Sequence, residues 1–368
     1  MVQPLLIRVR EQRICKAACV VMLMVCMVLP LHAWKKETKK TPEIPWPELL
    51  MDGGRKLTYQ QTFASERDIL GQPGFWTKVV NFVAGEKDYR PLVRPYSIAV
   101  DSRGRIIVTD PGAAGVHIFD LAQHKYKFLD RQEKSKDPMI EPQCVAVDAK
   151  DNIYITDSKA GKVFWFEASG KYRGAFGSLK GGEGFFKRPT GIAIDPATQE
   201  IYVTDTLRDR VYVLDPEGRV ERTFGQAGSG NGEFNLPTEI HIKGDTVAVV
   251  DAMNFRIQIF NRNGAFQGAI GAPGQTDLGI FRPKALAIDS EDHIYLVEGQ
   301  WGLVQVFNRE GQLLYHFGNG TGFGNFRLPS GLFIDRTDHI YLVDSYNRRV
   351  QIFQYFGLKE QASNRTGQ

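Results

Sequence analysis

The sequence contains little cysteine, and most of it lies in one short segment. Only four of the 368 residues are cysteines, and Cys15, Cys19 and Cys26 fall within the first 33 residues. Cys144 is the only cysteine that follows them. This scarcity excludes an internal disulfide in the rest of the chain. It also excludes a zinc site built from several thiolates and a CxxCH haem attachment site.

The sequence also lacks a strong charge of either sign. It has 46 Lys and Arg against 42 Asp and Glu, a formal net charge of +4. Arg8, Arg10, Arg13 and Lys16 against Glu11 give 4 − 1 = +3 within the first 33 residues, so the remainder is close to neutral. A nearly neutral chain does not favour nucleic acid as a partner.

The first 33 residues have the composition of an export signal. The basic head precedes the apolar run "AACVVMLMVCMVLPL", and "LHA" at 31–33 ends on a small residue, as signal-peptidase sites do. The apolar run is short for a membrane span. We therefore expect a cleaved signal peptide over 1–33, with an uncleaved membrane anchor as the alternative. Either implies a periplasmic, cell-envelope or extracellular protein.

Motifs of nucleotide-binding and hydrolytic enzymes are missing as well. The Gly-rich stretches "GSGNGEF" at 228 and "GNGTGFGNF" at 318 lack the GK[ST] ending of a phosphate-binding loop. Neither stands between an expected strand and an expected helix. The chain has no GxSxG, and we could assemble no Ser/His/Asp arrangement. We interpret the glycine clusters as turns.

What the sequence does contain is a unit repeated six times. Its third copy reads "RPTGIAIDPATQEIYVTDTLRDRVYVLDPEGRVERTFG", from 188 to 225. A proline opens the copies at positions 95, 142, 189, 237, 283 and 329, in steps of 46 to 48 residues. An acid ends the second segment at 110, 157, 205, 251, 298 and 344. Such a period is typical of a repeat architecture.

Each copy contains four short runs in which apolar and polar residues alternate. In the third copy the runs cover about 191–195, 200–205, 210–215 and 220–224, divided by turn residues. Four strands per unit in six units predict an all-β fold, the six-bladed β-propeller. A single blade cannot bury its apolar faces alone, so the blades must pack on each other in a closed ring.

The units resemble NHL repeats. The usual form of that repeat is close to "P-x-G-I-A-V-D…I-Y-V-T-D…N-R-I-Q-V-F…G", and "NFRIQIF" at 254 and "NRRVQIF" at 347 match it closely. The resemblance covers about residues 94–357 and implies a six-bladed NHL-type propeller. Some NHL propellers bind RNA and others belong to ubiquitin ligases through a separate RING, but an exported chain without RING cysteines favours neither activity.

The sixth copy stops at "VQIFQYFG" without a fourth strand, so another segment must cover its edge. Residues 55–63, "RKLTYQQTF", alternate as a strand does, whereas 75–84 contain apolar residues at helical spacing. We expect 55–63 to close the ring and 75–84 to form a short helix packed on it. The reverse assignment, with 75–83 as the closing strand, stays open.

These assignments divide the chain into four parts. They are the leader over 1–33, a charged Pro-rich tether over 34–54, the propeller over 55–357 and a flexible polar tail over 358–368.

An acid and a base recur on either side of the turn between the second and third strands. In a hairpin, Asp205 and Arg210 face each other, and an exposed ion pair there contributes only about 0.2–1 kcal/mol. We interpret these residues as structural clasps and expect an exchange of Asp205 with Arg210 to be nearly neutral. The four pairs are Asp157 with Lys162, Asp205 with Arg210, Asp251 with Arg256, and Asp344 with Arg349.

Two copies break this pattern. Asp110 is followed by "PGAAG" and Glu298 by "GQWG", so neither acid has a base at the expected position. Both copies flank the sixth in the closed ring, and aromatic residues lie on turns of the same arc. An unpaired acid beside exposed aromatic residues suggests a ligand or partner site. The candidate residues are Asp110, Phe255, Glu298, Trp301, Tyr346 and Arg348.

Histidines do not form a recognisable metal site. A zinc site needs three ligands that converge on one point. The histidines after the leader are distributed over different repeats, at 117, 124, 241, 293, 316 and 339. NHL-type propellers include a metal-dependent amidating lyase, but its histidine pattern cannot be placed on these positions. We expect no cofactor. Calcium held by carboxylates in the central channel stays an open alternative.

Taken together, these patterns favour a binding protein over an enzyme. We expect an exported propeller that acts as a non-catalytic scaffold for protein binding or assembly in the cell envelope. Its partner would be another envelope or extracellular protein, and the propeller itself a monomer. The alternatives are a propeller enzyme of the lyase or lactone hydrolase type with a metal in the channel, and a binder of small molecules or glycans.

Overall fold

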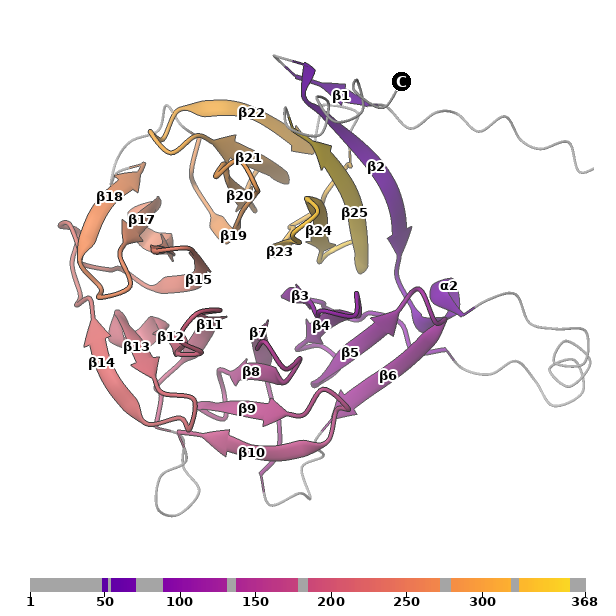
Figure 1. Ribbon diagram of the computed structural model, residues 1–368, viewed down its shortest axis with the longest axis horizontal. Coiled ribbons are helices and arrows are strands. Elements are labelled where there is room, and N and C mark those ends of the chain that lie inside the picture. The colour runs from indigo at the N-terminus through magenta and orange to yellow at the C-terminus, as the bar shows by residue number, and fades with distance from the viewer. Residues whose placement is uncertain are drawn as a thin grey trace, which may run out of the picture. The chain divides into compact units, whose positions relative to one another are not determined.

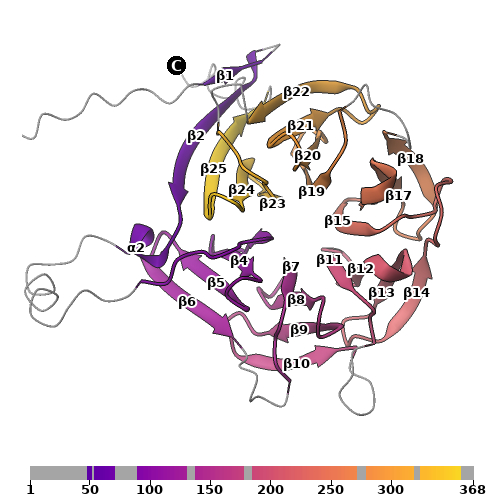
Figure 2. The ribbon, with the colours of Figure 1, turned by 180° about the vertical axis from the view of Figure 1, so that it is seen from behind.

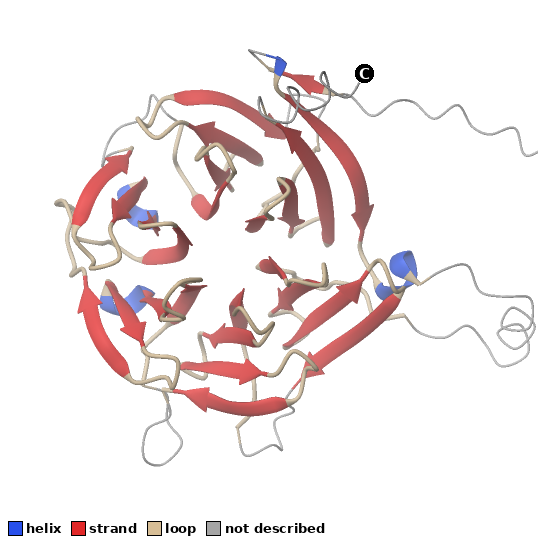
Figure 3. Ribbon diagram, viewed as in Figure 1, coloured by secondary structure: helices blue, strands red, loops and turns tan. Residues whose placement is uncertain are grey.

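The computed structural model describes residues 48–51, 54–70, 89–130, 137–177, 185–271, 279–318 and 324–357. All of them belong to the compact unit Trp46–Gln368. The leader, most of the tether, the helix expected over 75–84 and the tail lie outside the described residues. Within them, six antiparallel sheets surround a central axis (Figure 1). The expected all-β six-bladed propeller is confirmed, with very little helix (Figure 3).

The first five blades take their strands in chain order, with the first strand nearest the axis. The first blade contains β3 (Ile98–Val100), β4 (Ile106–Asp110), β5 (Gly115–Asp120) and β6 (Lys125–Asp130). The second contains β7 (Pro142–Val147), β8 (Ile153–Asp157), β9 (Lys162–Phe166) and β10 (Tyr172–Phe176). The third contains β11 (Pro189–Ile194), β12 (Ile201–Asp205), the short helix η2 (Thr206–Arg208), β13 (Arg210–Leu214) and β14 (Val220–Phe224).

The fourth and fifth blades follow the same plan. The fourth contains β15 (Pro237–Lys243), β16 (Thr246–Asp251), the short helix η3 (Ala252–Asn254), β17 (Arg256–Phe260) and β18 (Phe266–Ile270). The fifth contains β19 (Pro283–Ile288), β20 (Ile294–Glu298), β21 (Leu303–Phe307) and β22 (Leu313–Gly318). The inner strands of successive blades contact one another around the ring, and β23 returns to β3.

The sixth sheet combines residues from both ends of the propeller (Figure 2). It contains β23 (Gly331–Ile334), β24 (His339–Asp344) and β25 (Arg349–Phe356), followed outward by β2 (Lys56–Phe63) and β1 (Leu49–Leu50). β2 pairs antiparallel with β25 from Lys56↔Phe356 to Phe63↔Val350. Leu57 on β2 is fully buried in the core between the fifth and sixth blades. The helix α2 (Glu66–Ile69) follows β2.

Apolar side chains from facing sheets fill the space between blades. Each described cluster combines residues of two neighbouring blades, such as Tyr202 of β12 with Val249 of β16. Threonines on the second strands add hydrogen bonds across this space. Thr204 Oγ1 of β12 donates to the carbonyl of Thr238 at 3.2 Å, and Thr109 and Thr156 bond the next blade in the same way. The second strand therefore fixes the inner strand of its neighbour.

Gly191 of the third blade packs against the backbone of the fourth blade, and we expect Gly191→Ala to be destabilising. A Cβ at this position would be 2.7 Å from the Thr238 carbonyl oxygen and 2.8 Å from the Glu239 Cα. Both atoms are backbone and cannot rotate away, so the blades must separate, at a cost of about 1–3 kcal/mol. Urea unfolding followed by tryptophan fluorescence measures the loss.

Gly268→Ala provides the matched control. Gly268 is also in a strand, β18, but a Cβ there meets no atom within 4 Å. It should leave stability unchanged or slightly higher, because alanine restricts the unfolded chain. Equal losses in the two variants would refute the close-contact explanation.

Candidate functional site

The residues singled out by the sequence lie on one face of the ring. On this face the inner strands begin and the turns between the second and third strands are placed, because Pro189 pairs with Asp205 and Pro237 with Asp251. We call it the proline face. The opposite face carries the turns between the first and second strands and those between the third and fourth.

The repeat acids on the proline face are fully buried. Asp205 Oδ2 and Oδ1 accept hydrogen bonds from the backbone N–H groups of Lys187 and Arg188, both at 2.8 Å. In the other five blades, the equivalent acid accepts a hydrogen bond from at least one backbone N–H of the segment that precedes the blade's inner strand. These acids are Asp110, Asp157, Asp251, Glu298 and Asp344. Each acid therefore fixes the connection between two blades.

The expected clasp partners face each other, but only two pairs form the ion pair. Arg256 Nε lies 2.8 Å from Asp251 Oδ2, and Arg349 Nε lies 2.7 Å from Asp344 Oδ2. In the other two hairpins the base bonds elsewhere: Lys162 pairs with Asp137 at 2.9 Å, and Arg210 donates to the carbonyl of Gly225 at 3.3 Å. Arg208, the second arginine of the third turn, approaches Asp205 to 3.4 Å.

The premise of an exposed pair is wrong. The repeat acids are 0% exposed because the connecting segment between blades folds over each of them. A carboxylate that binds two backbone N–H groups cannot be exchanged for a cation without leaving those donors unsatisfied. The expectation that exchanging Asp205 with Arg210 leaves stability nearly unchanged therefore no longer has a physical basis.

The expectation that Asp110 and Glu298 lack a partner is also wrong. Asp110 accepts from the N–H groups of Val93 and Arg94 at 2.6 and 2.9 Å, and His117 Nε2 is 3.4 Å away. Burial alone would raise the pKa of Asp110, but His117 and these backbone donors hold it below its ordinary value. His117 lies two residues beyond the position where the other copies carry the base.

Glu298 is satisfied in the same way. It accepts from the backbone N–H groups of Phe281, Arg282 and Gln300 at 2.7–2.8 Å. Because Asp110 and Glu298 are both fully buried, neither carboxylate presents a surface that a ligand or partner would touch.

The aromatic candidates differ in exposure. Trp301 and Tyr346 are 52% and 58% exposed. Trp301 packs edge-to-face on Phe281, and Tyr346 lies under the Arg327 guanidinium at 4.4 Å. Phe255 instead packs on the core between the fourth and fifth blades. Arg348 is exposed near Tyr346 in the same turn, with a left-handed backbone of φ 55°.

Sequence reasoning missed a wider set of exposed apolar residues on the proline face. Most of the large apolar side chains that are exposed lie there: Val93, Ile140, Leu207, Met253, Phe281, Trp301, Leu328 and Tyr346. The others on the described residues are Leu50, Val220, Leu313 and Leu314. The pattern was visible in the sequence, because three of the set precede a repeat proline by two residues and three follow a repeat acid by two.

A cavity of about 600 Å³ occupies the centre of the ring. Its wall comes from all six inner strands and is mostly apolar, with small side chains such as Ala99, Ala146 and Ala193. Three polar side chains from β15, Glu239, His241 and Lys243, interrupt this wall.

Burial sets the protonation of the channel groups. It raises the pKa of Glu239 to about 7, although the Cys144 thiol and the Ile240 N–H oppose the rise. The Cys144 thiol donates to Glu239 Oε2 at 3.2 Å. Burial, with help from Lys243, lowers the pKa of His241 to about 4. At neutral pH the channel therefore contains a neutral imidazole and a carboxyl group near its midpoint of ionisation.

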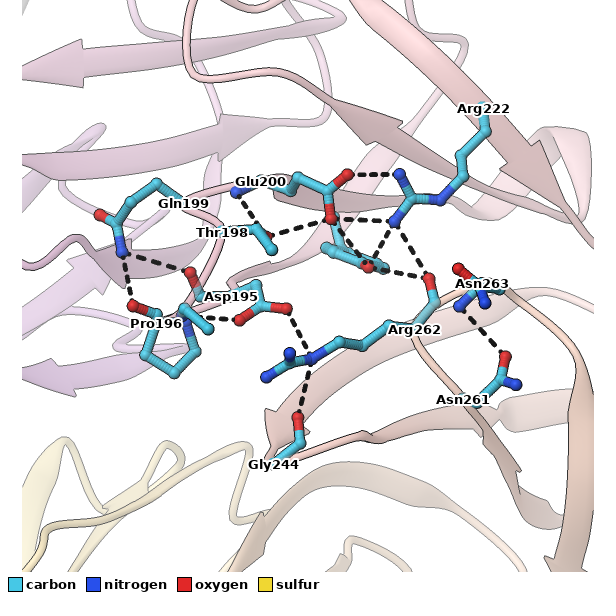
Figure 4. A network of polar contacts seen from close by, with 12 residues as sticks. Asp195, Pro196, Thr198, Gln199, Glu200, Arg222, Gly244, Asn261, Arg262 and Asn263 are labelled. Carbon is cyan, nitrogen blue, oxygen red and sulfur yellow. Dashed lines mark hydrogen bonds and ion pairs between the residues drawn. The ribbon is translucent and has the colours of Figure 1, made fainter.

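A polar network on the opposite face contains the acids Glu200 and Asp195 (Figure 4). Glu200 is bound by Arg222, whose hydrogen bonds lower the pKa of Glu200 to about 2. Asp195 pairs with Arg262 at 2.8 Å, and the Arg262 carbonyl accepts from Tyr202 at 3.0 Å. The network joins the third and fourth blades and pairs both acids with arginine, so its role is structural.

Within the described ranges, no three His, Cys, Asp or Glu side chains converge closely enough to hold a metal ion. In the same part of the chain, no helix has the length and apolar character needed to cross a membrane.

Comparisons with known proteins support the fold. A family described as six-bladed beta-propellers matches residues 192–257. A catalytically inactive virginiamycin B lyase from Staphylococcus aureus with quinupristin is 15% identical, over 71% of this chain and 94% of that one, with a TM-score of 0.52.

Two binding proteins show a similar likeness. A chain of the nidogen/laminin complex is 18% identical, over 66% of this chain and 87% of that one, with a TM-score of 0.53. An auxiliary nutrient binding protein from Bacteroides thetaiotaomicron is 12% identical, over 71% of this chain and 69% of that one, with a TM-score of 0.54. No curated protein matches the sequence. At these identities the likeness shows the fold alone: the chain forms a six-bladed β-propeller.

Proposed function

We propose that this propeller is a non-catalytic binding protein that docks another protein on its proline face. The observation that carries the proposal is the concentration of exposed apolar side chains there, including Trp301, Tyr346 and Met253. Exposed apolar side chains that lie together, as Phe281 and Trp301 do with their rings 6.0 Å apart, mark interaction surfaces, whereas singly scattered ones do not.

The composition of the proline face supports a protein partner. Exposed arginines alternate with the apolar residues around the ring: Arg94, Arg188, Arg208, Arg282, Arg327 and Arg348. Aromatic residues, Met and Arg are the types enriched at protein interfaces. Arg327 stacked on Tyr346 holds a rigid aromatic surface in place, which reduces the entropy lost on docking.

The partner follows from the expected location. If residues 1–33 direct export, the partner is an envelope or extracellular protein. Among the structural neighbours, the nidogen/laminin complex is a case in which a propeller-containing chain was crystallised with another protein. We also propose that the chain is an NHL-type propeller and that it is a monomer.

Replacing Trp301 and Tyr346 together with alanine should weaken partner capture about tenfold or more, because buried aromatic anchors each contribute over 1 kcal/mol to typical interfaces. Thermal stability should stay almost unchanged, since both side chains are more than half exposed. A cross-linked pull-down from the envelope fraction, quantified by mass spectrometry, measures capture.

Leu313→Ala with Leu314→Ala is the matched control, because both residues are exposed on the outer strand β22 and not on the proline face. Capture by this variant should equal that of the unmodified chain. If the Trp301 and Tyr346 variant captures the same proteins at the same yield, the docking proposal is lost.

A further inference from the structure

The central cavity extends along the inner strands toward the face opposite the proline face. At one end it is lined by Ser97 and Glu239, which lie near the starts of their inner strands. At the other end it is lined by Ser290, Asp335 and Asp338, in turns between first and second strands. The cavity is thus distinct from the apolar set on the proline face.

The size and surface of the cavity suit a small organic molecule. Its volume of about 600 Å³ lies within the range of small-molecule sites. Alanines at equivalent positions of the first three blades leave the space free, and Phe333 of β23 adds an aromatic surface. A ligand with an apolar body would contact this wall.

Glu239 is the unusual group of the wall. Its described donors are the Cys144 thiol at 3.2 Å and the backbone N–H of Ile240 at 3.3 Å. No described Lys or Arg forms an ion pair with it, whereas Glu200 and Asp195 each have an arginine. A carboxylate that lines an enclosed channel with only these two donors and no cation is unfavourable, in contrast to Glu298, which binds three backbone N–H groups. A bound cation would remove that cost.

The charges at the end lined by Asp335 and Asp338 favour the approach of a cation. The buried Asp289 lies beside them. Two cations are present there as well, but the Lys243 ammonium is 2.8 Å from Asp292 and already bound, and Arg336 is exposed to solvent. Acids that line the low-dielectric mouth of a cavity concentrate cations near it.

We propose that the central channel binds a small organic cation, whose ammonium group pairs with Glu239 and whose apolar body lies against Ala99, Ala146 and Ala193. Phe333 adds an aromatic surface on which part of a cationic ligand can stack. A metal ion fits less well, because calcium and magnesium need several oxygen ligands and Glu239 supplies the only carboxylate at that end of the cavity lining.

Calorimetric titration of the purified full chain with three matched probes tests the proposal. The probes are phenethylammonium, the neutral 2-phenylethanol and the anionic 3-phenylpropionate, which share an aromatic body and differ in charge. Phenethylammonium should bind at least tenfold more tightly than the alcohol, and 3-phenylpropionate should not bind.

Two variants locate the site. Glu239→Gln keeps the side-chain shape, removes the charge and should reduce phenethylammonium affinity at least tenfold. Ala193→Leu keeps the charge, fills part of the cavity and should also weaken binding. Glu217→Gln, on an exposed turn, is the control and should bind as the unmodified chain does.

Failure of phenethylammonium to bind the unmodified chain would overturn the proposal. Equal affinity for the cation and the alcohol would do so too, as would undiminished binding to the Glu239→Gln variant. The result is independent of docking, because the Trp301 and Tyr346 variant should bind phenethylammonium normally and the Glu239→Gln variant should capture partners normally.

Discussion

Asp251→Ala is expected to lower the free energy of unfolding by about 3–5 kcal/mol, the cost of breaking a buried ion pair by removing one partner. The Asp251 carboxylate is 0% exposed and accepts from Arg256 Nε at 2.8 Å and from the Asn235 N–H at 2.7 Å. Asn254 and Gln258 also donate to it, at 2.8 and 3.0 Å. Alanine leaves the buried Arg256 without a counter-ion. Urea unfolding at pH 7 measures the loss.

Two further variants separate this effect from a general effect of charge removal. Asp245→Ala removes an exposed carboxylate of the same blade and should change stability by less than about 0.5 kcal/mol. Asp251→Ala combined with Arg256→Ala should cost less than the sum of the single losses, because the two residues interact. A loss for Asp251→Ala as small as that for Asp245→Ala would show that the pair behaves as an exposed one.

Local patterns were sufficient to predict the blades. The runs expected over 200–205 and 210–215 correspond to β12 and β13, because alternation with period two and the turn at 206–209 are encoded within a few neighbouring residues. The pairing of Asp205 with Arg210 in register follows from the same hairpin. The sequence did not reveal the burial of Asp205, because its donors are backbone N–H groups of Lys187 and Arg188, and any residue type supplies such a donor.

The sequence indicates which residues of the channel are unusual, but it does not indicate that they touch. Cys144 and Glu239 both stand two residues after a repeat proline, where the other copies have Ser, Gly or Ala. Aligning the repeats therefore reveals two unusual residues at one level of the ring. Their contact, however, joins the second blade to the fourth past Gly191 of the third, and only the curvature of the closed ring brings them to 3.2 Å.

Glu239→Gln is expected to raise the free energy of unfolding by about 3 kcal/mol at pH 8 and to leave it nearly unchanged at pH 4. The pKa of Glu239 rises from 4.5 to about 7 on folding, and each unit corresponds to about 1.4 kcal/mol. Below pH 4.5 the carboxyl is protonated in both states. Between pH 4.5 and 7 it ionises in the unfolded chain first, so the unmodified protein loses stability as pH rises. Above pH 7 the loss is constant.

Glutamine does not titrate, so the difference between the two proteins should grow from pH 4.5 to 7 and then level off. The other titratable groups near Glu239 are Tyr96, Cys144 and His241, and they are present in both proteins, so their contributions largely cancel. Glu217→Gln should follow the unmodified chain at every pH. A difference that stays flat would mean that Glu239 is ionised in the folded protein. Saturating phenethylammonium should reduce the difference at pH 8, because a cation that pairs with Glu239 stabilises only the protein that carries the carboxylate.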